Sequence, residues 1–224
     1  MTIVNQQVPL RSRTVGDIAA TMPGATGILL DFCCGGDIAL ENAALQGGID
    51  LAEVEHALNA LDELESATPV PQQTSELIDH ILTRYHETHR RELPELVKLG
   101  RKVEAVHSDH PQAPRGLADT LQQMLGELEV HMKKEELILF PAMRQRSEGN
   151  LGVPIAQMRH DHDDHGEHLR KLESITDNFT LPEGACRSWQ ALYAGSAKLS
   201  NDLMEHIHLE NNVLFPRYEE PSKG

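Results

Sequence analysis

The segment His131-Met-Lys-Lys-Glu135-Glu-Leu-Ile-Leu-Phe-Pro141 carries a pattern that occurs again at His206-Ile-His-Leu-Glu210-Asn-Asn-Val-Leu-Phe-Pro216. Each copy reads His-x-x-x-Glu and then an apolar run that ends in Leu-Phe-Pro, and the copies start 75 positions apart, at 131 and 206. Residues four positions apart on a helix lie on one face, so each copy directs an imidazole and a carboxylate to the same side. Two such helices facing each other would supply most of a site for two metal ions.

The composition limits the class of protein. The chain has 224 residues, enough for one or two domains with a substantial core. Its 35 acidic residues outnumber 20 Lys+Arg and give a formal charge of -15, which argues against nucleic acid or an anionic membrane surface as a partner. The apolar runs are far shorter than the ~20 residues of a membrane helix, and residues 1–15 lack the apolar stretch of a secretory signal. We therefore expect a cytoplasmic location.

The pattern of helix signals predicts an all-α chain in two parts. Thr14, Asp37 and Asp50 can each begin a short helix, and Gly47-Gly48 separates the last two. The sequence Ser66-Ala-Thr-Pro-Val-Pro-Gln-Gln73 is typical of a linker. We therefore expect a small helical domain over residues 1–66, a linker over 67–73 and a second domain over 74–224.

The second domain reads as four long amphipathic helices with short connections, the pattern of an up-down-up-down bundle. Their expected spans are about Ser75–Val106, Leu117–Arg146, Pro154–Asn178 and Pro182–Tyr218, the last one capped by Thr180. Because proline lacks an N–H and clashes with the preceding turn, Pro94 and Pro141 should kink or loosen their helices.

Heptad positions place titratable residues on the inner face of every helix. The second helix has Leu121, Met124, Leu128, His131, Glu135 and Ile138 on that face, and the fourth has Leu192, Ser196, Leu199, Leu203, His206, Glu210 and Val213. The first helix contributes His86 and His89, and the third contributes His162 and His165. A buried carboxylate without a cation costs several kcal/mol. We therefore expect a cation close to Glu135 and Glu210, near these histidines.

The spacing indicates a duplicated helical hairpin. His86 precedes His131 by 45 positions and His162 precedes His206 by 44, so each hairpin supplies one His and then His-x-x-x-Glu. Four imidazoles and two shared carboxylates would suit two Fe, Mn or Zn ions with an open position on each. His89 and His165, one turn on, match equally well at 42 and 41 positions, so spacing leaves the choice open.

Two carboxylates and a pair of cysteines are further candidates for a functional role. Glu127 precedes His131 by one turn and Asp161 adjoins His162, so either carboxylate can orient an imidazole. Cys33 and Cys34 lie in Phe32-Cys-Cys-Gly-Gly-Asp37, just before an expected helix start, where thiols have lowered pKa values and bind metals well. An odd number of cysteines, three, suits a reducing compartment rather than a disulfide framework.

The chain resembles the hemerythrin-like di-iron superfamily and, more closely, the bacterial repair-of-iron-centres proteins, the YtfE/ScdA family. The motifs that carry the resemblance are Cys33-Cys-Gly-Gly36, Ile78-Asp-His-Ile-Leu-x-Arg-Tyr-His86, Pro94-Glu-Leu, His131-Met-x-Lys-Glu135-Glu-x-Ile-Leu-Phe-Pro141 and Asp202-Leu-Met-x-His206-Ile-x-Leu-Glu210-Asn-Asn-Val-Leu-Phe-Pro216. They extend over nearly the whole chain, and together they are highly specific.

The resemblance implies a hemerythrin-like four-helix bundle that holds two iron ions and a bridging oxo or hydroxo group. It places the iron ligands on His86, His131, His162 and His206, with Glu135 and Glu210 as bridging carboxylates. It also places the family's vicinal thiols on Cys33 and Cys34 and its outer carboxylates on Glu127 and Asp161. Asp161 stands where a relative carries Glu. Residues 159–168 are richer in histidine than the family pattern. His165, like His89, is therefore a candidate for a position beside the ligands.

The function implied by the resemblance is repair of iron-sulfur clusters damaged by nitrosative or oxidative stress, through iron donation, nitric oxide binding or both. The partners would be damaged iron-sulfur proteins or a cluster-assembly scaffold, with nitric oxide or dioxygen as small ligands, and a homodimer is compatible with this reading. Enzymatic nitric oxide reduction is one alternative. A hemerythrin-like oxygen carrier or sensor is another, although such carriers generally have an additional His and an Asp bridge.

Overall fold

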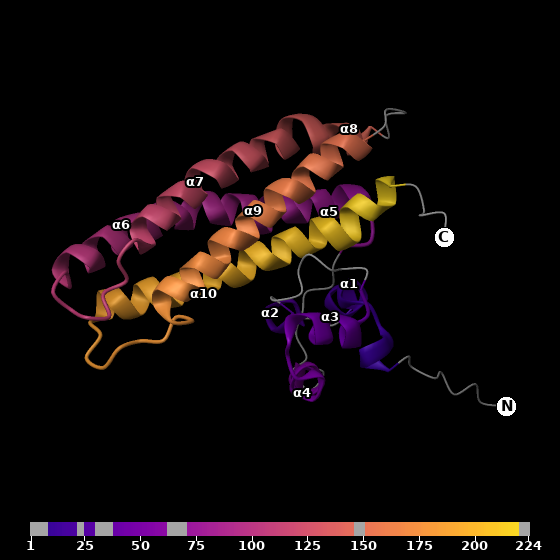
Figure 1. Ribbon diagram of the computed structural model, residues 1–224. Helices are drawn as coiled ribbons and strands as arrows, with labels where there is room; N and C mark the ends of the chain where they lie inside the picture. The colour runs from indigo at the N-terminus through magenta and orange to yellow at the C-terminus, as the bar shows by residue number, and fades with distance from the viewer. Residues whose placement is uncertain (1–8, 22–24, 30–37, 62–70, 146–150, 220–224) are drawn as a thin grey trace. The chain divides into compact units, whose positions relative to one another are not determined.

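The computed structural model describes residues 9–21, 25–29, 38–61, 71–145 and 151–219 (Figure 1). By its contacts the chain divides into two compact units. One comprises Met1–Val70 with Ile207–Pro216, and the other comprises Pro71–His206 with Arg217–Gly224. Throughout the described ranges the architecture is helical, which confirms the all-α prediction; the β-structure there is an isolated bridge between Thr14 and Ala39.

The N-terminal residues form short helices whose ends follow the sequence signals. The helices are α1 (Val15–Thr21), α2 (Ala25–Ile28), α3 (Leu40–Gly47) and α4 (Leu51–Leu61). Thr14 Oγ1 accepts a hydrogen bond from the N–H of Asp17 at 3.1 Å, and Asp50 Oδ1 accepts one from the N–H of Ala52 at 2.8 Å, so both residues cap helices as predicted. Gly48 ends α3 with a φ of 66°, a left-handed conformation that favours glycine.

The core of these short helices is small and entirely apolar. Its fully or nearly fully buried members include Ile18, Leu29, Leu40, Val54 and Leu58. The third predicted cap, Asp37, and the Cys33-Cys34 pair lie outside the described residues.

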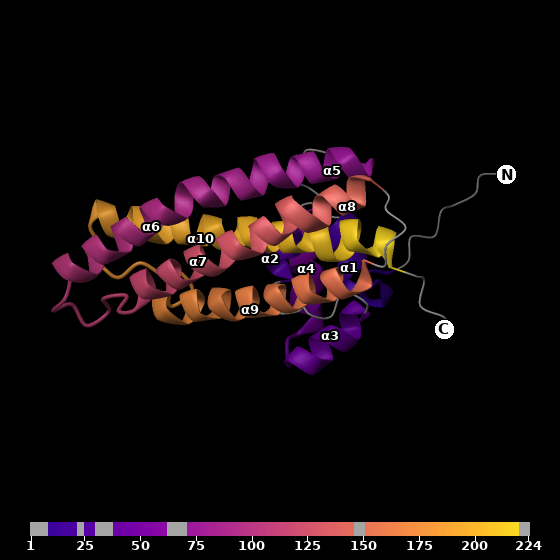
Figure 2. The same cartoon turned by 90° about the horizontal axis from the view of Figure 1, so that it is seen from above.

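The long helices run side by side as a four-helix bundle (Figures 1 and 2). In chain order they are α5 (Thr74–Ile81) with α6 (Glu87–Val106), α7 (Leu117–Lys134) with α8 (Phe140–Arg144), α9 (Gly152–Thr176), and α10 (Arg187–His208), and a final 3-10 turn covers Phe215–Tyr218. Helix α6 runs through Pro94 without interruption. The bundle thus agrees with the predicted spans of the first three helices to within a few residues.

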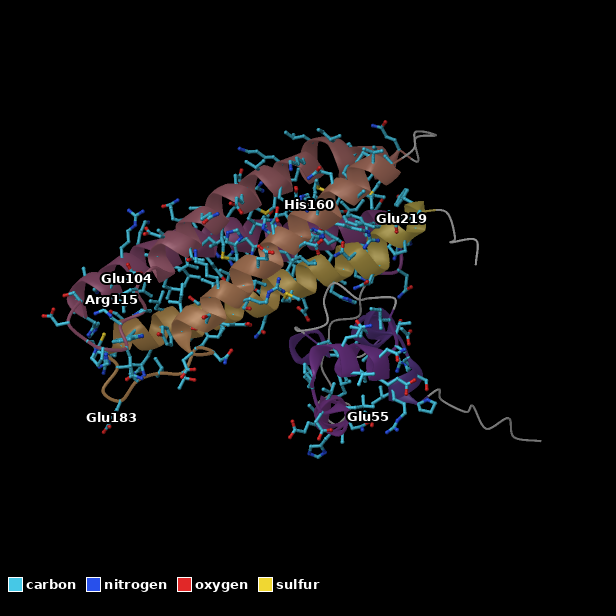
Figure 3. All side chains as sticks on the ribbon, viewed as in Figure 1. Glu55, Glu104, Arg115, His160, Glu183 and Glu219 are labelled. Carbon is cyan, nitrogen blue, oxygen red and sulfur yellow. The ribbon has the colours of Figure 1, made fainter. Side chains whose placement is uncertain are left out.

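The loop between α6 and α7 is held by side chains from both of its ends. Glu104 Oε1 accepts a hydrogen bond from the N–H of Ala118 at 2.9 Å, which satisfies a free donor at the start of α7. Arg115 donates to the carbonyl of Ser108 at 2.6 Å, and Gly116 takes a φ of 90° immediately before the helix. The side chains of Glu104 and Arg115, which are labelled in Figure 3, lie at this end of the bundle.

The start of the fourth helix differs from the prediction. Helix α10 begins at Arg187 rather than near Pro182, and Thr180 is not its cap. The reason is the preceding turn, in which Asp177, Asn178 and Phe179 all have φ values between 51° and 58°. Such left-handed residues end α9 and leave the next few residues as turns before a helix can resume.

Three of the long helices contain a π turn that the sequence pattern did not reveal. The turns span Leu82–His86, Glu135–Leu139 and Leu209–Leu214, and after each one an N–H donates to the carbonyl five residues back. Two of the turns end two residues before Pro141 and Pro216. A wider turn there accommodates a proline that has no N–H and needs space near the carbonyl of the preceding turn, so the expected loosening at Pro141 takes this form.

The π turns correct the predicted inner face. Ile138 is 64% exposed, whereas Leu139 is 2% exposed. In the other copy Leu214 is fully buried and Val213 is only half-buried. A π turn adds one residue to the helix, so after Glu135 and Glu210 the inward position moves from the third following residue to the fourth.

None of the helices described by the structure is long and apolar enough to cross a lipid bilayer. The long helices have a buried apolar stripe on one face and charged residues on the other.

Candidate metal centre

Six titratable side chains are buried in the middle of the bundle. They are His86, His131, Glu135, His162, His206 and Glu210, and none of them is more than 4% exposed. All six were expected at the centre, and the long helices place them there because each occupies the inner stripe of its helix. His86, Glu135 and Glu210 also lie within the three π turns, which sets their direction relative to the straight helix before them.

The six residues form two groups that share both carboxylates. One group is His86, Glu135, His206 and Glu210, and the other is His131, Glu135, His162 and Glu210. In each group the ligand atoms lie within 4.8 Å of one another. The Nε2 atoms of His86 and His206 are 3.2 Å apart, and those of His131 and His162 are 3.1 Å apart.

Glu135 lies between the two groups. Its Oε2 is 3.4 Å from Nε2 of His86 and its Oε1 is 3.4 Å from Nε2 of His131, so each oxygen faces one group. This is the arrangement expected of a carboxylate that bridges two ions. The side chain is completely buried, where a carboxylate is costly unless cations are close.

The electrostatics favour a neutral imidazole at His206. Burial lowers the pKa of His206 well below its usual value, and the neighbouring His86 lowers it further, although Glu135 acts in the opposite direction. A neutral imidazole carries the lone pair that binds a metal but does not offset the charge of Glu135 or Glu210. Divalent cations would accept the imidazole lone pairs and would offset the charge of the two carboxylates. The residues present therefore fit a metal centre.

The structure separates the histidines that spacing could not. His86 and His162 belong to the two groups, whereas His89 and His165 lie beside them. The ring of His89 is centred 5.5 Å from that of His206, and the ring of His165 is 5.0 Å from that of His131. Burial is the main cause that lowers the pKa of His89 to about 3 and that of His165 to about 2.

Asp161 holds one imidazole from outside. Its Oδ2 lies 3.3 Å from Nδ1 of His131 and accepts a hydrogen bond from Lys134 at 2.7 Å, while Gln157 donates to its Oδ1 at 2.8 Å. The bond to His131 is the main cause that lowers the pKa of Asp161, and Lys134 lowers it further. An ionised Asp161 accepts a hydrogen bond from Nδ1–H of His131, which leaves Nε2 with its lone pair toward the centre.

Glu127 has different partners. Its Oε1 accepts a hydrogen bond from Gln123 at 2.9 Å, and its Oε2 lies 3.5 Å from Nδ1 of His168. Glu127 and His131 both line a pocket, which is described below, but no hydrogen bond joins these two side chains in the structure.

Sequence reasoning missed Glu136, which orients the imidazole of His86. Its Oε1 lies 2.8 Å from Nδ1 of His86, and both of its oxygens accept hydrogen bonds from Arg90, at 2.7 and 3.2 Å. Burial raises the pKa of Glu136, but the bonds from Arg90 and His86 outweigh it and the net shift is downward. The available signal was a second acid directly after Glu135. On a regular α-helix, neighbouring residues point in different directions, so Glu136 was not expected to face the first helix.

A second cluster of side chains supports His206, which belongs to the same group as His86. The ring of Tyr85 stacks on that of His206 at 5.4 Å with an interplanar angle of 3°, and its hydroxyl donates to Glu205 at 3.1 Å. The adjacent Arg84 donates to both oxygens of Asp202, at 2.6 and 3.2 Å. These bonds tie the first π turn, which ends at His86, to helix α10.

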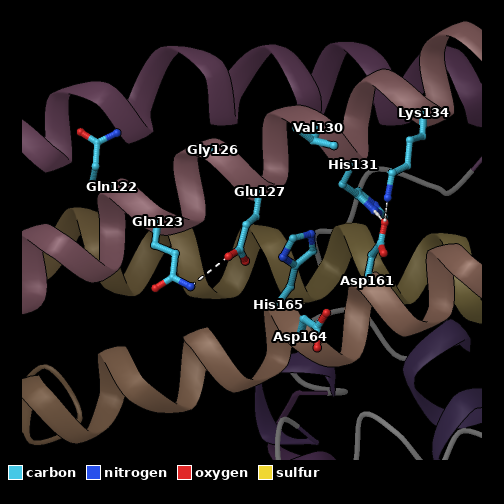
Figure 4. Close-up of a pocket in the computed structure, with 10 residues that line it drawn as sticks. All are labelled: Gln122, Gln123, Gly126, Glu127, Val130, His131, Lys134, Asp161, Asp164 and His165. Carbon is cyan, nitrogen blue, oxygen red and sulfur yellow. Dashed lines mark hydrogen bonds and ion pairs between the residues drawn. The ribbon is translucent and has the colours of Figure 1, made fainter.

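A pocket between α7 and α9 has one of the six buried residues, His131, in its wall (Figure 4). Its volume is about 510 Å³. Its lining residues are Gln122, Gln123, Gly126, Glu127, Val130, His131, Lys134, Asp161, Asp164 and His165. Because His131 belongs both to this wall and to the buried groups, a small molecule in the pocket would lie close to the centre.

Among the described residues, no cysteine belongs to either group. Cys33 and Cys34 lie outside the described residues. Cys186 is half-buried at the other end of the bundle, immediately before α10, where its Sγ is 3.1 Å from Nε2 of His107.

Comparison with known proteins agrees with this arrangement. The family model described as the hemerythrin HHE cation binding domain matches residues 77–218, and the one named ScdA_N, a domain of unknown function, matches residues 11–62. The iron-sulfur cluster repair protein YtfE of Edwardsiella ictaluri is 46% identical over 213 residues, 92% of this chain and 96% of its own length.

Two further relatives show the same coverage. A probable iron-sulfur cluster repair protein of Haemophilus influenzae is 44% identical over 91% of this chain and 95% of its own length. The YtfE protein of Yersinia pseudotuberculosis is 46% identical over 92% of this chain and 96% of its own length. The motifs quoted above and these two comparisons lead to one conclusion: the chain belongs to the hemerythrin HHE family and, within it, to the YtfE group of proteins named for iron-sulfur cluster repair.

Proposed function

We propose that the six buried residues hold two iron ions. The observation that carries the proposal is that Glu135 and Glu210 belong to both ligand groups, while each group has its own pair of histidines. Two imidazoles and two shared carboxylates suit borderline divalent metals such as iron, manganese and zinc. The names of the relatives favour iron among these. Iron bound here would supply redox and ligand-binding chemistry at positions that the protein leaves open.

We further propose that the protein repairs iron-sulfur clusters damaged by nitrosative or oxidative stress. The relatives that match over more than nine-tenths of this chain carry the name of that role. Damaged iron-sulfur proteins or a cluster-assembly scaffold in the cytoplasm would be the partners. Residues 1–66, with Cys33 and Cys34, would form a thiol-bearing domain, and residues 67–73 would link it to the bundle over 74–224.

In this proposal iron is the cargo. An imidazole that binds a metal is neutral and adds no charge, and the two carboxylates would neutralise much of the charge of the metal. Glu136 fixes His86, and Asp161 fixes His131, so two of the four imidazoles present Nε2 to the centre in a set direction.

The first test is of the metal. Protein purified without oxygen and loaded with ferrous iron should contain two iron ions per chain, located at the two groups by anomalous diffraction at the iron edge. His131→Ala should lose at least one of them. An occupied centre with one ion, or an ion bound outside these residues only, would contradict the proposal.

The second test is of the activity. Iron-loaded protein should restore the activity of a hydratase whose [4Fe-4S] cluster has been damaged by nitric oxide, and it should transfer labelled iron to an apo-scaffold. Glu135→Ala, loaded under the same conditions, should do neither. If equal concentrations of free ferrous iron perform as well as the loaded protein, the repair role fails even though the centre binds iron.

A second candidate function is the binding or reduction of nitric oxide, favoured by the pocket of about 510 Å³ that ends at His131. Adding nitric oxide without oxygen to the reduced, iron-loaded protein should change its visible spectrum, and a nitric oxide electrode would show consumption if the gas is reduced. A spectrum that does not change rejects this function and leaves iron donation standing.

A further inference from the structure

A third group of metal-binding side chains lies beside the pocket. It consists of Glu127 on α7 and of His165 and His168 on α9, and it contains none of the six buried residues. One ligand atom from each of the three lies within 4.8 Å of the others. His165 and His168 are three positions apart, so they share a face of their helix, and Glu127 meets them from the neighbouring helix.

We propose that Glu127, His165 and His168 form a separate site for one divalent cation of the zinc class, open to solvent through the pocket. Imidazole and carboxylate are the ligands that zinc and similar borderline metals accept. Three protein ligands with a fourth position for water is a common arrangement for such an ion.

The accessibility of the three residues suits an ion that enters from solvent. Glu127 is exposed, His168 is half-buried and His165 is 3% exposed. Glu127 and His165 both line the pocket, and Figure 4 shows the His165 ring with one nitrogen toward the carboxylate of Glu127. An ion can therefore first meet the exposed carboxylate and then the buried imidazole.

His165 has a buried polar atom that the protein leaves unsatisfied. Its Nε2 has no hydrogen-bond partner among the described residues, although the ring occupies a buried position. Such an atom needs an explanation, because burying a polar group without a partner costs free energy. Binding of a metal ion by Nε2 of His165, next to the carboxylate of Glu127, would explain it.

The two other ligands are already positioned by neighbours. Nδ1 of His168 lies 3.0 Å from the carbonyl of Asp164, to which the ring can donate its hydrogen, so that Nε2 carries the lone pair. Gln123 donates to Oε1 of Glu127 at 2.9 Å, and Oε2 of Glu127 lies 3.5 Å from Nδ1 of His168, the nitrogen that also faces Asp164. Metal bonds of 2.0–2.1 Å to nitrogen need ligand atoms about 3.3 Å apart, which small rotations of the exposed Glu127 can supply.

The test uses the full-length protein with its iron centre loaded, and zinc ions as the probe. Equilibrium dialysis against micromolar zinc should show one zinc ion bound per chain with no loss of iron. His168→Ala and, separately, Glu127→Gln should each weaken zinc binding by about tenfold or more, since a lost ligand costs at least as much as a lost outer-sphere partner. His160→Ala is the matched control, because this exposed histidine lies on the same helix outside the group (Figure 3).

Each other result overturns the inference. If zinc uptake equals iron release, the zinc has entered the iron centre. If His168→Ala and His160→Ala bind zinc like the parent, or if no zinc binds, the group is an ion pair on the surface beside a buried histidine. The test is independent of the repair role, because a protein without iron-transfer activity can still show the zinc site, and the reverse also holds.

Discussion

Nδ1 of His86 lies 2.8 Å from Oε1 of Glu136, and this contact determines which nitrogen of His86 faces the metal centre. The glutamate is held by two hydrogen bonds from Arg90, so it is ionised and fixed in place. It accepts a hydrogen bond from Nδ1–H of His86, and the unprotonated Nε2 then faces Nε2 of His206 and Glu135.

Glu136→Gln should therefore weaken the hold on iron. The loss of an outer carboxylate on a metal-bound histidine typically lowers affinity by about 10–100-fold. Competition with a chromophoric chelator would measure it. Glu129→Gln is the matched control, because Glu129 also accepts from Arg90, at 2.7 Å, but does not contact His86. Equal affinities in the two variants would show that Glu136 serves only to bind Arg90.

Glu135→Gln should change the stability of the metal-free and metal-bound protein in opposite directions. With a chelator present, the variant should be at least as stable to urea as the parent, because it no longer buries a carboxylate at a position with no exposure. A ligand present at 100 times its dissociation constant stabilises a protein by about 2.7 kcal/mol, and the variant should lose most of this gain with ferrous iron. The exposed Glu95→Gln should behave like the parent in both conditions. A variant that is destabilised equally with and without iron would count against the bridging role.

The register after the π turn can be tested with two neighbouring residues. Leu139→Ala should reduce the free energy of unfolding by about 2–5 kcal/mol, whereas Ile138→Ala should change it by no more than about 0.5 kcal/mol. The reason is that Leu139 is 2% exposed and Ile138 is 64% exposed. Urea denaturation of both variants would measure the difference. The reverse order would show that an ordinary α-helix continues through Glu135.

Asp202→Asn should destabilise the bundle at neutral pH and much less in acid. Burial raises the pKa of Asp202, but hydrogen bonds from Arg84 and Lys198 outweigh it, so the folded protein has a lowered pKa. The stabilisation is therefore complete above the usual carboxyl pKa near 4 and is lost as the pH falls through the lowered value. We expect a loss of about 1–3 kcal/mol at pH 7 that shrinks below pH ~4, measured by urea denaturation at both pH values. A difference that is independent of pH would mean that the amide disturbs packing rather than charge.

Much of this architecture follows from the sequence itself. The repeated His-x-x-x-Glu and the apolar stripes determine four long helices, because a helix brings residues four positions apart onto one face and must bury its apolar side. The same stripes carry His131, His206, Glu135 and Glu210 into the interior, where the structure confirms them as buried. Local hydrogen bonds likewise determine the caps at Thr14 and Asp50.

Other features depend on contacts between helices, which no single segment encodes. His86 and His89 have the same spacing signal, and only the packed bundle separates the one in a ligand group from the one beside it. The π turns move Leu139 and Leu214 inward, because one added residue in a turn rotates the residues that follow. The contact between Glu136 and His86 likewise joins two different helices. The third group at Glu127, His165 and His168 joins two helices across the bundle. The sequence thus determines which residues face inward, and the tertiary structure determines which of them meet, since the partners of a buried polar group come from neighbouring helices.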